Sequence, residues 1–337
     1  MHRWDPIAPP VSGLVVPVRI DPTGRTGPTR GQARGPRWRI TSPGLVVPAT
    51  VVDDLVEQRI LEASARGDGR AVVTGWAALR LHGAGFFDGL ARDGCTRLPV
   101  PIAATGGRLR SRDGIQVVED RIPPDEVVVI HGIRCATVER ALFDEMRRIG
   151  DVREMAVAVG SACAARLTSV KRMRLYAATR RWYRDVRMVR EAVELAVEGC
   201  RSPQEDRFRL IWECDAGWGR PLCNRPVFDL DGRPIAVPDL LDPARGVVGE
   251  YAGADHRDID RHERDIAREA DLRGVGLEYV EVVGRDLRDS RRIVRRMNEA
   301  AERAQFLTRQ WVLGAPASPS LDELLDRRDA ARARRDT

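Results

Sequence analysis

The chain has 337 residues, of which 43% are hydrophobic and 31% charged, and its formal net charge is +6. This length exceeds what one ordinary hydrophobic core holds, so we expect two domains with additional tails. No run of the sequence approaches the roughly 18–20 apolar residues that a membrane helix needs, so we expect no membrane-spanning segment.

The charge is divided unevenly between the two parts of the chain. Residues 1–200 hold 31 Lys+Arg and 23 Asp+Glu, a net +8, whereas residues 201–337 hold 25 and 27, a net −2. Residues 1–44 are rich in Pro, Gly and Arg, which predicts a disordered basic leader rather than a signal peptide, and hence a cytoplasmic protein. Such a leader either attracts phosphates non-specifically or is simply a solvated arm.

The six cysteines are scattered and include no CxxC pair. This distribution predicts reduced thiols rather than disulfides or a zinc site. The cysteines are Cys95, Cys135, Cys163, Cys200, Cys214 and Cys223.

Residues 45–200 predict a mixed α+β domain that ends in helices. A helix is expected over 52–66, and a strand followed by a short helix over 72–83. β-branched runs separated by Gly, Pro and Asp predict strands at 97–104, 115–119 and 126–131. Four helices then fit residues 137–149, 151–164, 168–182 and 185–199.

Basic and aromatic side chains are mixed within the third of these helices and directly after it. Such a cluster either meets nucleic-acid phosphates or forms a solvated helix face. Its members are Lys171, which is the only lysine of the chain, Arg172, Arg174, Arg180, Arg181 and Arg184, with Tyr176, Trp182 and Tyr183 among them.

Residues 201–310 predict an α/β domain with the element order αβββαβα. Ser202 at the N-cap and Pro203 at the first helical position begin its first helix. Asp231-Gly232 predicts a hairpin turn between the first two strands. The strands are expected at about 226–230, 234–241 and 246–252, and the later helix, strand and helix at 258–274, 277–283 and 286–310. The remaining residues, 311–337, have few core residues and predict a mobile tail.

Two acids lie on the second and third of these strands. Asp239 lies at or near the end of an apolar strand and Glu250 ends the next one, so a hairpin of this length can bring the two carboxylates together. Mg²⁺ suits such a pair because it takes a few carboxylates and completes its shell with water and phosphate oxygens. A cation held there can activate water against a phosphodiester. Glu205, on the first helix, can add a third acid.

The same stretch resembles a known nuclease family. Pro238-Asp239 followed by Glu250 resembles the paired-acid motif of PD-(D/E)XK nucleases. Ser202-Pro-Gln-Glu205, Glu250-Tyr-Ala-Gly253 and His256 are also similar to bacterial domains related to very-short-patch mismatch-repair endonucleases. The resemblance implies a restriction-endonuclease-like fold, Mg²⁺ as the cofactor and DNA as the substrate class. It also implies that Asp239 binds the metal, that Glu205 supports it and that His256 assists at the phosphate.

The chain departs from the usual family pattern two residues after the second acid, where a lysine is expected and Ala252 stands. Arg257 is nearby in sequence, but a guanidinium with a pKa above about 12 does not act as a base. Each candidate residue also has a structural interpretation. Asp239 can cap the turn before Pro243, Glu250 can pair with Arg264 or Arg268, Glu205 can be an acid favoured by the helix dipole, and His256 can be an ordinary helix-start residue.

The first domain resembles a different family. Gly44-Leu-Val-Val-Pro48, the block 74–83 and Cys135-Ala-Thr-Val-Glu-Arg-Ala-Leu-Phe-Asp144 together are similar to abortive-infection (AbiEi-type) antitoxin proteins. That resemblance implies a DNA-binding repressor encoded in a toxin operon. Three functions therefore remain open: a metal-dependent endonuclease, a non-catalytic DNA-binding regulator of antitoxin type, and an interaction protein without a nucleic-acid partner.

Overall fold

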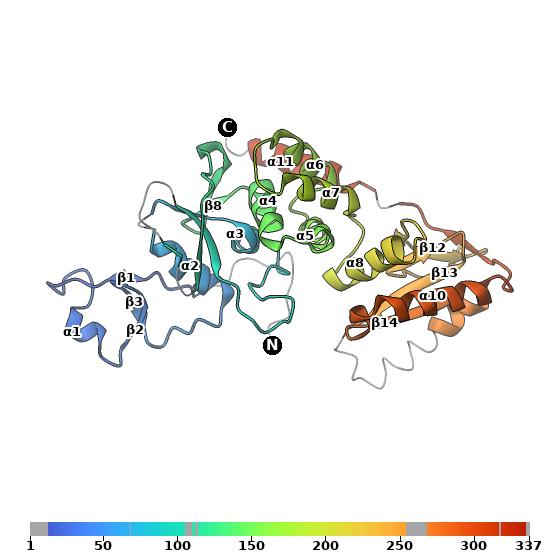
Figure 1. Cartoon of the computed structure of the whole chain (residues 1–337), viewed down its shortest axis with the longest axis horizontal. Helices are drawn as coiled ribbons and strands as arrows, with labels where there is room; N and C mark the ends of the chain where they lie inside the picture. The colour runs from blue at the N-terminus through green and yellow to red at the C-terminus, as the bar shows by residue number, and fades with distance from the viewer. Residues whose placement is uncertain are drawn as a thin grey trace. The chain divides into compact units, whose positions relative to one another are not determined.

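The protein is described here by a computed structural model, and it combines helices with several separate β-sheets, as the predicted α+β character requires (Figure 1). The chain divides into two compact units, residues 1–150 with 175–189, and residues 151–174 with 190–337. We call these unit 1 and unit 2. The residues that the structure describes are 13–67, 69–104, 110–111, 114–253, 268–316 and 318–334.

Unit 1 begins with a small sheet, and two of its three strands lie in the segment 1–44 that was predicted to be a disordered leader. Its strands β1 (Val18–Arg19), β2 (Trp38–Ser42) and β3 (Leu45–Pro48) pair in the order β1-β3-β2, and α1 (Arg30–Ala33) precedes β2. The described part of the leader is therefore structured. Val46 and Val47 of β3 are fully buried, which gives this sheet an apolar anchor. Gln58 of α2 (Val56–Ala65) adds two hydrogen bonds to the backbone of Val15.

The main sheet of unit 1 has five strands in the order β6-β5-β4-β8-β7. The strands are β4 (Ala71–Val73), β5 (Val100–Ala104), β6 (Ile115–Val118), β7 (Val127–Ile130) and β8 (Ile133–Ala136), and α3 (Gly75–Leu81), α4 (Val138–Ile149) and the short η1 (Pro124–Glu126) accompany them. β8 was not predicted from the sequence. His131 and Gly132 both have positive φ, so they form the two-residue turn that returns the chain from β7 into β8.

Unit 2 is built around a four-stranded sheet with the order β14-β13-β12-β9, in which β13 and β14 are parallel and the other pairs antiparallel. Its strands are β9 (Leu222–Cys223), β12 (Leu240–Asp242), β13 (Val247–Ala252) and β14 (Glu278–Val283). Its helices are α5 (Val152–Ala164), α8 (Pro203–Leu210), η2 (Ile211–Asp215), η3 (Asp286–Arg288) and α10 (Ser290–Ala304). Helices α6 (Val170–Thr179) and α7 (Val186–Leu195) contribute to both units.

Both faces of this sheet are covered. Phe208 and Trp212 of α8 and η2 pack with Met297 of α10 on one face, where Figure 1 shows α8 and α10 beside the strands. On the other face, Leu272 and Trp311 pack against alternate residues of the same strands. Each strand therefore presents successive side chains to two different cores.

The predicted strand 234–241 is divided between two sheets. Its first part, β11 (Pro234–Ala236), pairs with β10 (Val227–Asp229), which also pairs with β15 (Trp311–Leu313). Its last part is β12, which pairs with β13. The break contains Pro238, whose nitrogen has no hydrogen for a sheet ladder. The predicted αβββαβα order therefore describes unit 2 only coarsely.

The segment predicted to be a mobile tail forms defined elements within its described residues. Trp311 of β15 is buried, and α11 (Leu321–Ala333) starts with a capping box at Ser320. Arg172 of α6 forms ion pairs with Asp326 and Asp329 of α11, which lies beside α6 in Figure 1. These contacts join residues about 150 positions apart, so no local sequence pattern reveals them.

Over the residues that can be described, none of the helices combines the length and the apolar character needed to cross a membrane.

Candidate functional site

The two strand acids lie opposite each other in unit 2. Leu240 of β12 pairs with Gly249 of β13 in the antiparallel register, and Asp239 directly precedes β12. Extending this register by one position sets Asp239 opposite Glu250. Directly opposed residues of an antiparallel pair project from the same face, with Cβ atoms about 4.5–5.5 Å apart. The structure therefore brings together the two residues that the sequence predicted as metal ligands.

Asp239 is held in place from both neighbouring strands. Its Oδ2 accepts a hydrogen bond of 2.8 Å from the backbone nitrogen of Tyr251, and its carbonyl oxygen accepts one of 3.0 Å from the nitrogen of Asn224. The turn before residue 247 is capped instead by Asp242, whose Oδ1 accepts from the nitrogens of Ala244 and Arg245. The interpretation of Asp239 as the turn cap is therefore wrong.

Glu205 lies in the first turn of α8, which begins where Ser202 caps it as predicted. Its Oε2 accepts hydrogen bonds from the nitrogen of Arg201, at 2.8 Å, and from Nδ2 of Asn224, at 3.0 Å. Asn224 thus connects Glu205 to the backbone of Asp239. The carboxylate of Glu205 is oriented by specific donors in addition to the helix dipole.

Glu250 forms an ion pair, as one of its two interpretations predicted. Nη2 of Arg268 lies 2.5 Å from Oε1 of Glu250 and donates a second hydrogen bond, of 3.1 Å, to the carbonyl oxygen of Val237. Glu250 is 9% exposed. Arg268 therefore supplies a positive charge beside a buried carboxylate, without being able to act as a base.

Burial and the charges of neighbouring acids raise the pKa values of Asp239 and Glu250. Desolvation and then the charge of Glu205 raise the pKa of Asp239 to about 6. Desolvation and then the charge of Asp239 raise the pKa of Glu250 to about 8, and the attraction of Arg268 does not compensate for these two effects. Among the residues that the structure describes at this site, Glu250 therefore holds a proton at neutral pH, and a bound cation would favour its ionised form.

Sequence reasoning missed a further acid, Glu281 of β14. In the parallel register Glu281 pairs with Glu250, and its neighbours Val280 and Val282 point into the core on the α8 and α10 face. Glu281 therefore projects from the face that carries Glu250, and it is exposed. The available signal was the single acid Glu281 between Val280 and Val282 of an otherwise apolar stretch.

The donors at this site are of the type that a hard cation takes. Each of Glu205, Asp239 and Glu250 offers carboxylate oxygens, and one oxygen of each is already oriented by a donor. Across the described segments, no group of three or more His, Cys, Asp and Glu side chains is placed to hold a metal ion. Mg²⁺ is nevertheless bound in many proteins through only one or two carboxylates, with water and substrate oxygens completing the shell. Asp239 and Glu250 fit that requirement in donor chemistry.

The remaining residues considered for this site in the sequence analysis add no charged side chain beside the two carboxylates in the described part of the chain. His256 and Arg257 lie outside the described residues, as does Arg264. Ala252, at the position where the family pattern has lysine, is the last residue of β13. The only lysine, Lys171, lies 3.6 Å from Asp322 of α11 rather than at this site.

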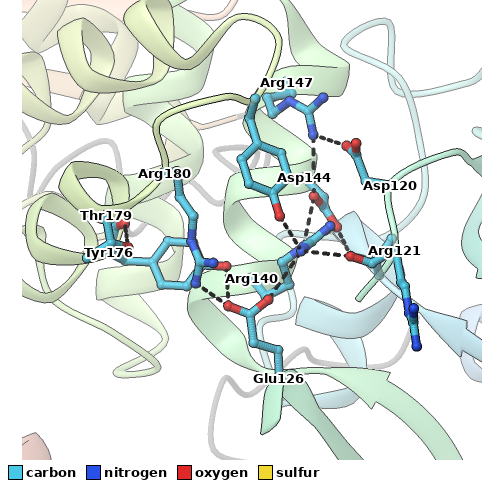
Figure 2. A network of polar contacts seen from close by, with 11 residues as sticks. Asp120, Arg121, Glu126, Arg140, Asp144, Arg147, Tyr176, Thr179 and Arg180 are labelled. Carbon is cyan, nitrogen blue, oxygen red and sulfur yellow. Dashed lines mark hydrogen bonds and ion pairs between the residues drawn. The ribbon is translucent and has the colours of Figure 1, made fainter. Parts of the chain in front are cut away.

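Unit 1 contains a second group of buried charges (Figure 2). The guanidinium of Arg140 in α4 is completely buried, and Figure 2 shows it between Asp144 and Glu126. Its Nε lies 3.1 Å from Asp144 and its Nη1 3.2 Å from Glu126. Further ion pairs join Glu126 to Arg180 and Asp120 to Arg147. We call these residues the Arg140 network.

The predicted basic cluster is largely neutralised by neighbouring acids. Arg172 pairs with α11, Arg174 with Glu194 and Arg180 with Glu126. Tyr176 and Tyr183 point inward and hydrogen-bond to Glu126 and Arg140. Trp182 is 95% exposed, and Arg181 and Arg184 on either side of it are exposed as well. Arg184 lies 3.2 Å from Asp185, so within the described contacts Arg181 and Trp182 best keep the character of a nucleic-acid contact.

Comparison with known proteins found no match among family models, curated proteins or solved structures.

Proposed function

We propose that unit 2 carries a divalent-cation-dependent phosphodiesterase centre that cleaves DNA in the cytoplasm. The observation that carries the proposal is the register of β12 with β13, which when extended by one position sets Asp239 opposite Glu250, together with the hydrogen bond from the nitrogen of Tyr251 to Oδ2 of Asp239. The mixed sheet β14-β13-β12-β9, with α8 and α10 on one face, supports a restriction-endonuclease-like arrangement of this region. The resemblance of Pro238-Asp239 and Glu250 to the PD-(D/E)XK motif supports the same conclusion.

Asp239 and Glu250 would hold Mg²⁺, and Glu205 would support them from α8. When bound, the cation lowers the pKa of water and offsets the charge that develops on a phosphodiester. The chain itself orients the carboxylates through the nitrogens of Tyr251 and Arg201. Arg268 lies beside Glu250 and favours its ionised form, which is the form that a cation would bind. We assign His256 the orientation of water or of the leaving oxygen, because imidazole titrates near neutral pH.

Contact with DNA is supported by features of unit 1. Trp182 offers an exposed ring on which a base can stack, and Arg181 and Arg184 can meet phosphates. The basic segment 1–44 adds non-specific attraction.

The test is a cleavage assay with plasmid, mismatched and branched DNA in the presence of Mg²⁺ or Mn²⁺. Wild type is compared with Asp239→Asn and with Asp231→Asn, which removes an equal charge from an exposed turn of the same unit. We expect cation-dependent cutting by wild type and Asp231→Asn, and a loss of at least about 100-fold in Asp239→Asn, equivalent to about 2.7 kcal/mol of transition-state stabilisation.

A folded wild-type protein that cuts none of these substrates, or an Asp239→Asn variant that cuts normally, would contradict the proposal. Far-ultraviolet circular dichroism and a cooperative unfolding transition establish that each variant is folded.

A second candidate function is a non-catalytic DNA-binding regulator of antitoxin type, encoded beside a toxin. It is favoured by two observations at the site, namely Ala252 in place of the motif lysine and the Arg268–Glu250 ion pair. This candidate predicts salt-dependent binding to the promoter of its own operon in the absence of divalent cations. Fluorescence anisotropy with promoter and scrambled duplexes in a chelating buffer distinguishes it, because equal affinity for both duplexes would contradict specific regulation.

A further inference from the structure

Two cysteines lie side by side at the edge of the unit 2 sheet. Cys200 precedes α8 and Cys223 ends β9, and their Sγ atoms are 3.6 Å apart. Cys200 is buried, whereas Cys223 is partly exposed. The backbones approach closely as well, since a Cβ atom at Gly199 would lie only 2.7 Å from Cβ of Cys223. A glycine at 199 is thus what allows the two segments to meet.

Each cysteine is adjacent in sequence to a group that orients Glu205. The nitrogen of Arg201, next to Cys200, and Nδ2 of Asn224, next to Cys223, both donate to Oε2 of Glu205. Nδ2 of Asn224 also donates to the carbonyl oxygen of Gly199, at 3.0 Å. A change in the separation of the two cysteines therefore moves the donors of Glu205.

We propose that Cys200 and Cys223 form a dithiol site that small disulfide oxidants convert into an intramolecular disulfide. Both sulfurs are already in contact, and a disulfide bond of about 2.05 Å requires them to approach by only about 1.5 Å more. The site is not suggested by cysteine spacing, because 22 residues separate the two positions and no CxxC motif is present.

The exchange proceeds in two balanced steps. Cys223 is the accessible sulfur, so its thiolate attacks one sulfur of the oxidant, forms a mixed disulfide and releases the first oxidant thiolate. Cys200 then loses its proton and attacks the sulfur of Cys223, which breaks the mixed disulfide and releases the second oxidant thiolate. The two protein thiol protons end on the two released thiolates, so the oxidant is reduced by two electrons and the protein is oxidised by two.

The expected order of attack agrees with the surroundings of the two thiols. Sγ of Cys200 donates its hydrogen to Sγ of Cys223, and this hydrogen bond together with burial raises the pKa of Cys200 well above its usual range. Cys200 is therefore held as a thiol until the mixed disulfide forms. The oxidised form would fix residues 199–201 against residues 222–224 and so restrict the donors of Glu205.

The experiment uses the reduced full-length chain, incubated with glutathione disulfide, alkylated and mapped by peptide mass spectrometry. We expect peptides containing Cys200 and Cys223 to be joined, with a loss of two hydrogen atoms. Cys200→Ser should carry one glutathione at Cys223 and no internal cross-link. Cys214→Ser is the matched control, because Cys214 is exposed in the same unit and should not change the cross-link.

Complete alkylation of Cys200 and Cys223 at oxidant concentrations that modify the exposed Cys95 and Cys214 would overturn the proposal. So would a cross-link that joins either residue mainly to another cysteine. Titration of both redox forms with Mn²⁺ separates this inference from the proposed function. Absence of binding to the reduced form counts against the phosphodiesterase centre, whereas the mapped cross-link alone decides the dithiol site.

Discussion

The Arg140 network and the Asp239–Glu250 pair are both buried groups of ionisable side chains. They differ in how completely their acids are paired with guanidinium groups. In the Arg140 network each acid is matched by a guanidinium, with Arg140, Arg147 and Arg180 facing Glu126, Asp144 and Asp120. At the strand pair, the charge of Glu205 acts on Asp239 and on Glu250, and the charge of Asp239 acts on Glu250, whereas the ion pair found among the described residues joins Arg268 to Glu250.

This difference separates a structural role from a ligand-binding one. A buried network whose charges compensate one another needs no further partner, and removing one member leaves the others unpaired. A buried group with an excess of one sign either takes up protons or binds an ion of the opposite sign. The first arrangement should therefore support folding, whereas the second should respond to pH and to cations.

The largest expected effect is that of Arg140→Met on the stability of unit 1. This change leaves the carboxylates of Glu126 and Asp144 buried without their central partner, so we expect a loss of about 3–5 kcal/mol in the free energy of unfolding. Urea denaturation measures it. Arg184→Met is the control, because Arg184 is 86% exposed and should change stability by no more than about 0.5 kcal/mol. Equal losses of stability in Arg140→Met and Arg184→Met would contradict a structural role for the Arg140 network.

The second prediction concerns pH and Glu250. The pKa of this carboxyl rises from 4.5 to about 8 on folding. Between pH 4.5 and pH 8 the folded protein therefore keeps a proton on Glu250 that the unfolded chain has released. The stability that this group contributes is therefore complete below about pH 4.5 and is lost as the pH rises to about 8.

Glu250→Gln imitates the protonated side chain and isolates this effect. Relative to wild type, the variant should become more stable with rising pH, by up to about 1.4 kcal/mol per pH unit between pH 5 and 8. Denaturant unfolding at several pH values checks this. Glu299→Gln, at an exposed position of α10, is the matched control and should show no such slope. A wild-type stability that rises relative to Glu250→Gln over this range would refute the assignment.

The smallest expected effect is that of Arg268→Met, the counterpart of Arg140→Met at the second site. The side chain of Arg268 is 37% exposed, and Glu250 is mainly protonated at pH 7, so little ionic attraction is lost. We expect a change of about 1 kcal/mol or less in the free energy of unfolding at pH 7. A loss comparable to that of Arg140→Met would show that the two sites are alike.

The sequence predicted the acids of the site better than their partners. Asp239 and Glu250 were expected to meet because a short hairpin joins them, and the register of β12 with β13 and the hydrogen bond from Tyr251 to Asp239 agree with this expectation. The sequence left open whether Glu250 pairs with Arg264 or with Arg268, because contacts between a strand and a later helix depend on tertiary packing. Glu281 was missed because the pairing of β13 with β14 is parallel and spans about 30 residues.

The terminal segments were the least predictable parts of the fold. The composition of residues 13–44 predicted disorder, but Val46 and Val47 of β3 provide a buried strand with which this segment pairs. The basic cluster and the C-terminal tail were interpreted separately, whereas Arg172 pairs with Asp326 and Asp329. Charge patterns of opposite sign at distant positions show complementarity only once the fold brings them together.

The most direct test of the proposed cation site is calorimetric titration with Mn²⁺ at pH 8. Wild type and Asp231→Asn should each bind one ion, and Asp239→Asn should bind it at least about tenfold more weakly, equivalent to about 1.4 kcal/mol. Equal affinity in all three proteins, or no binding to any of them, would contradict a cation site at Asp239 and Glu250.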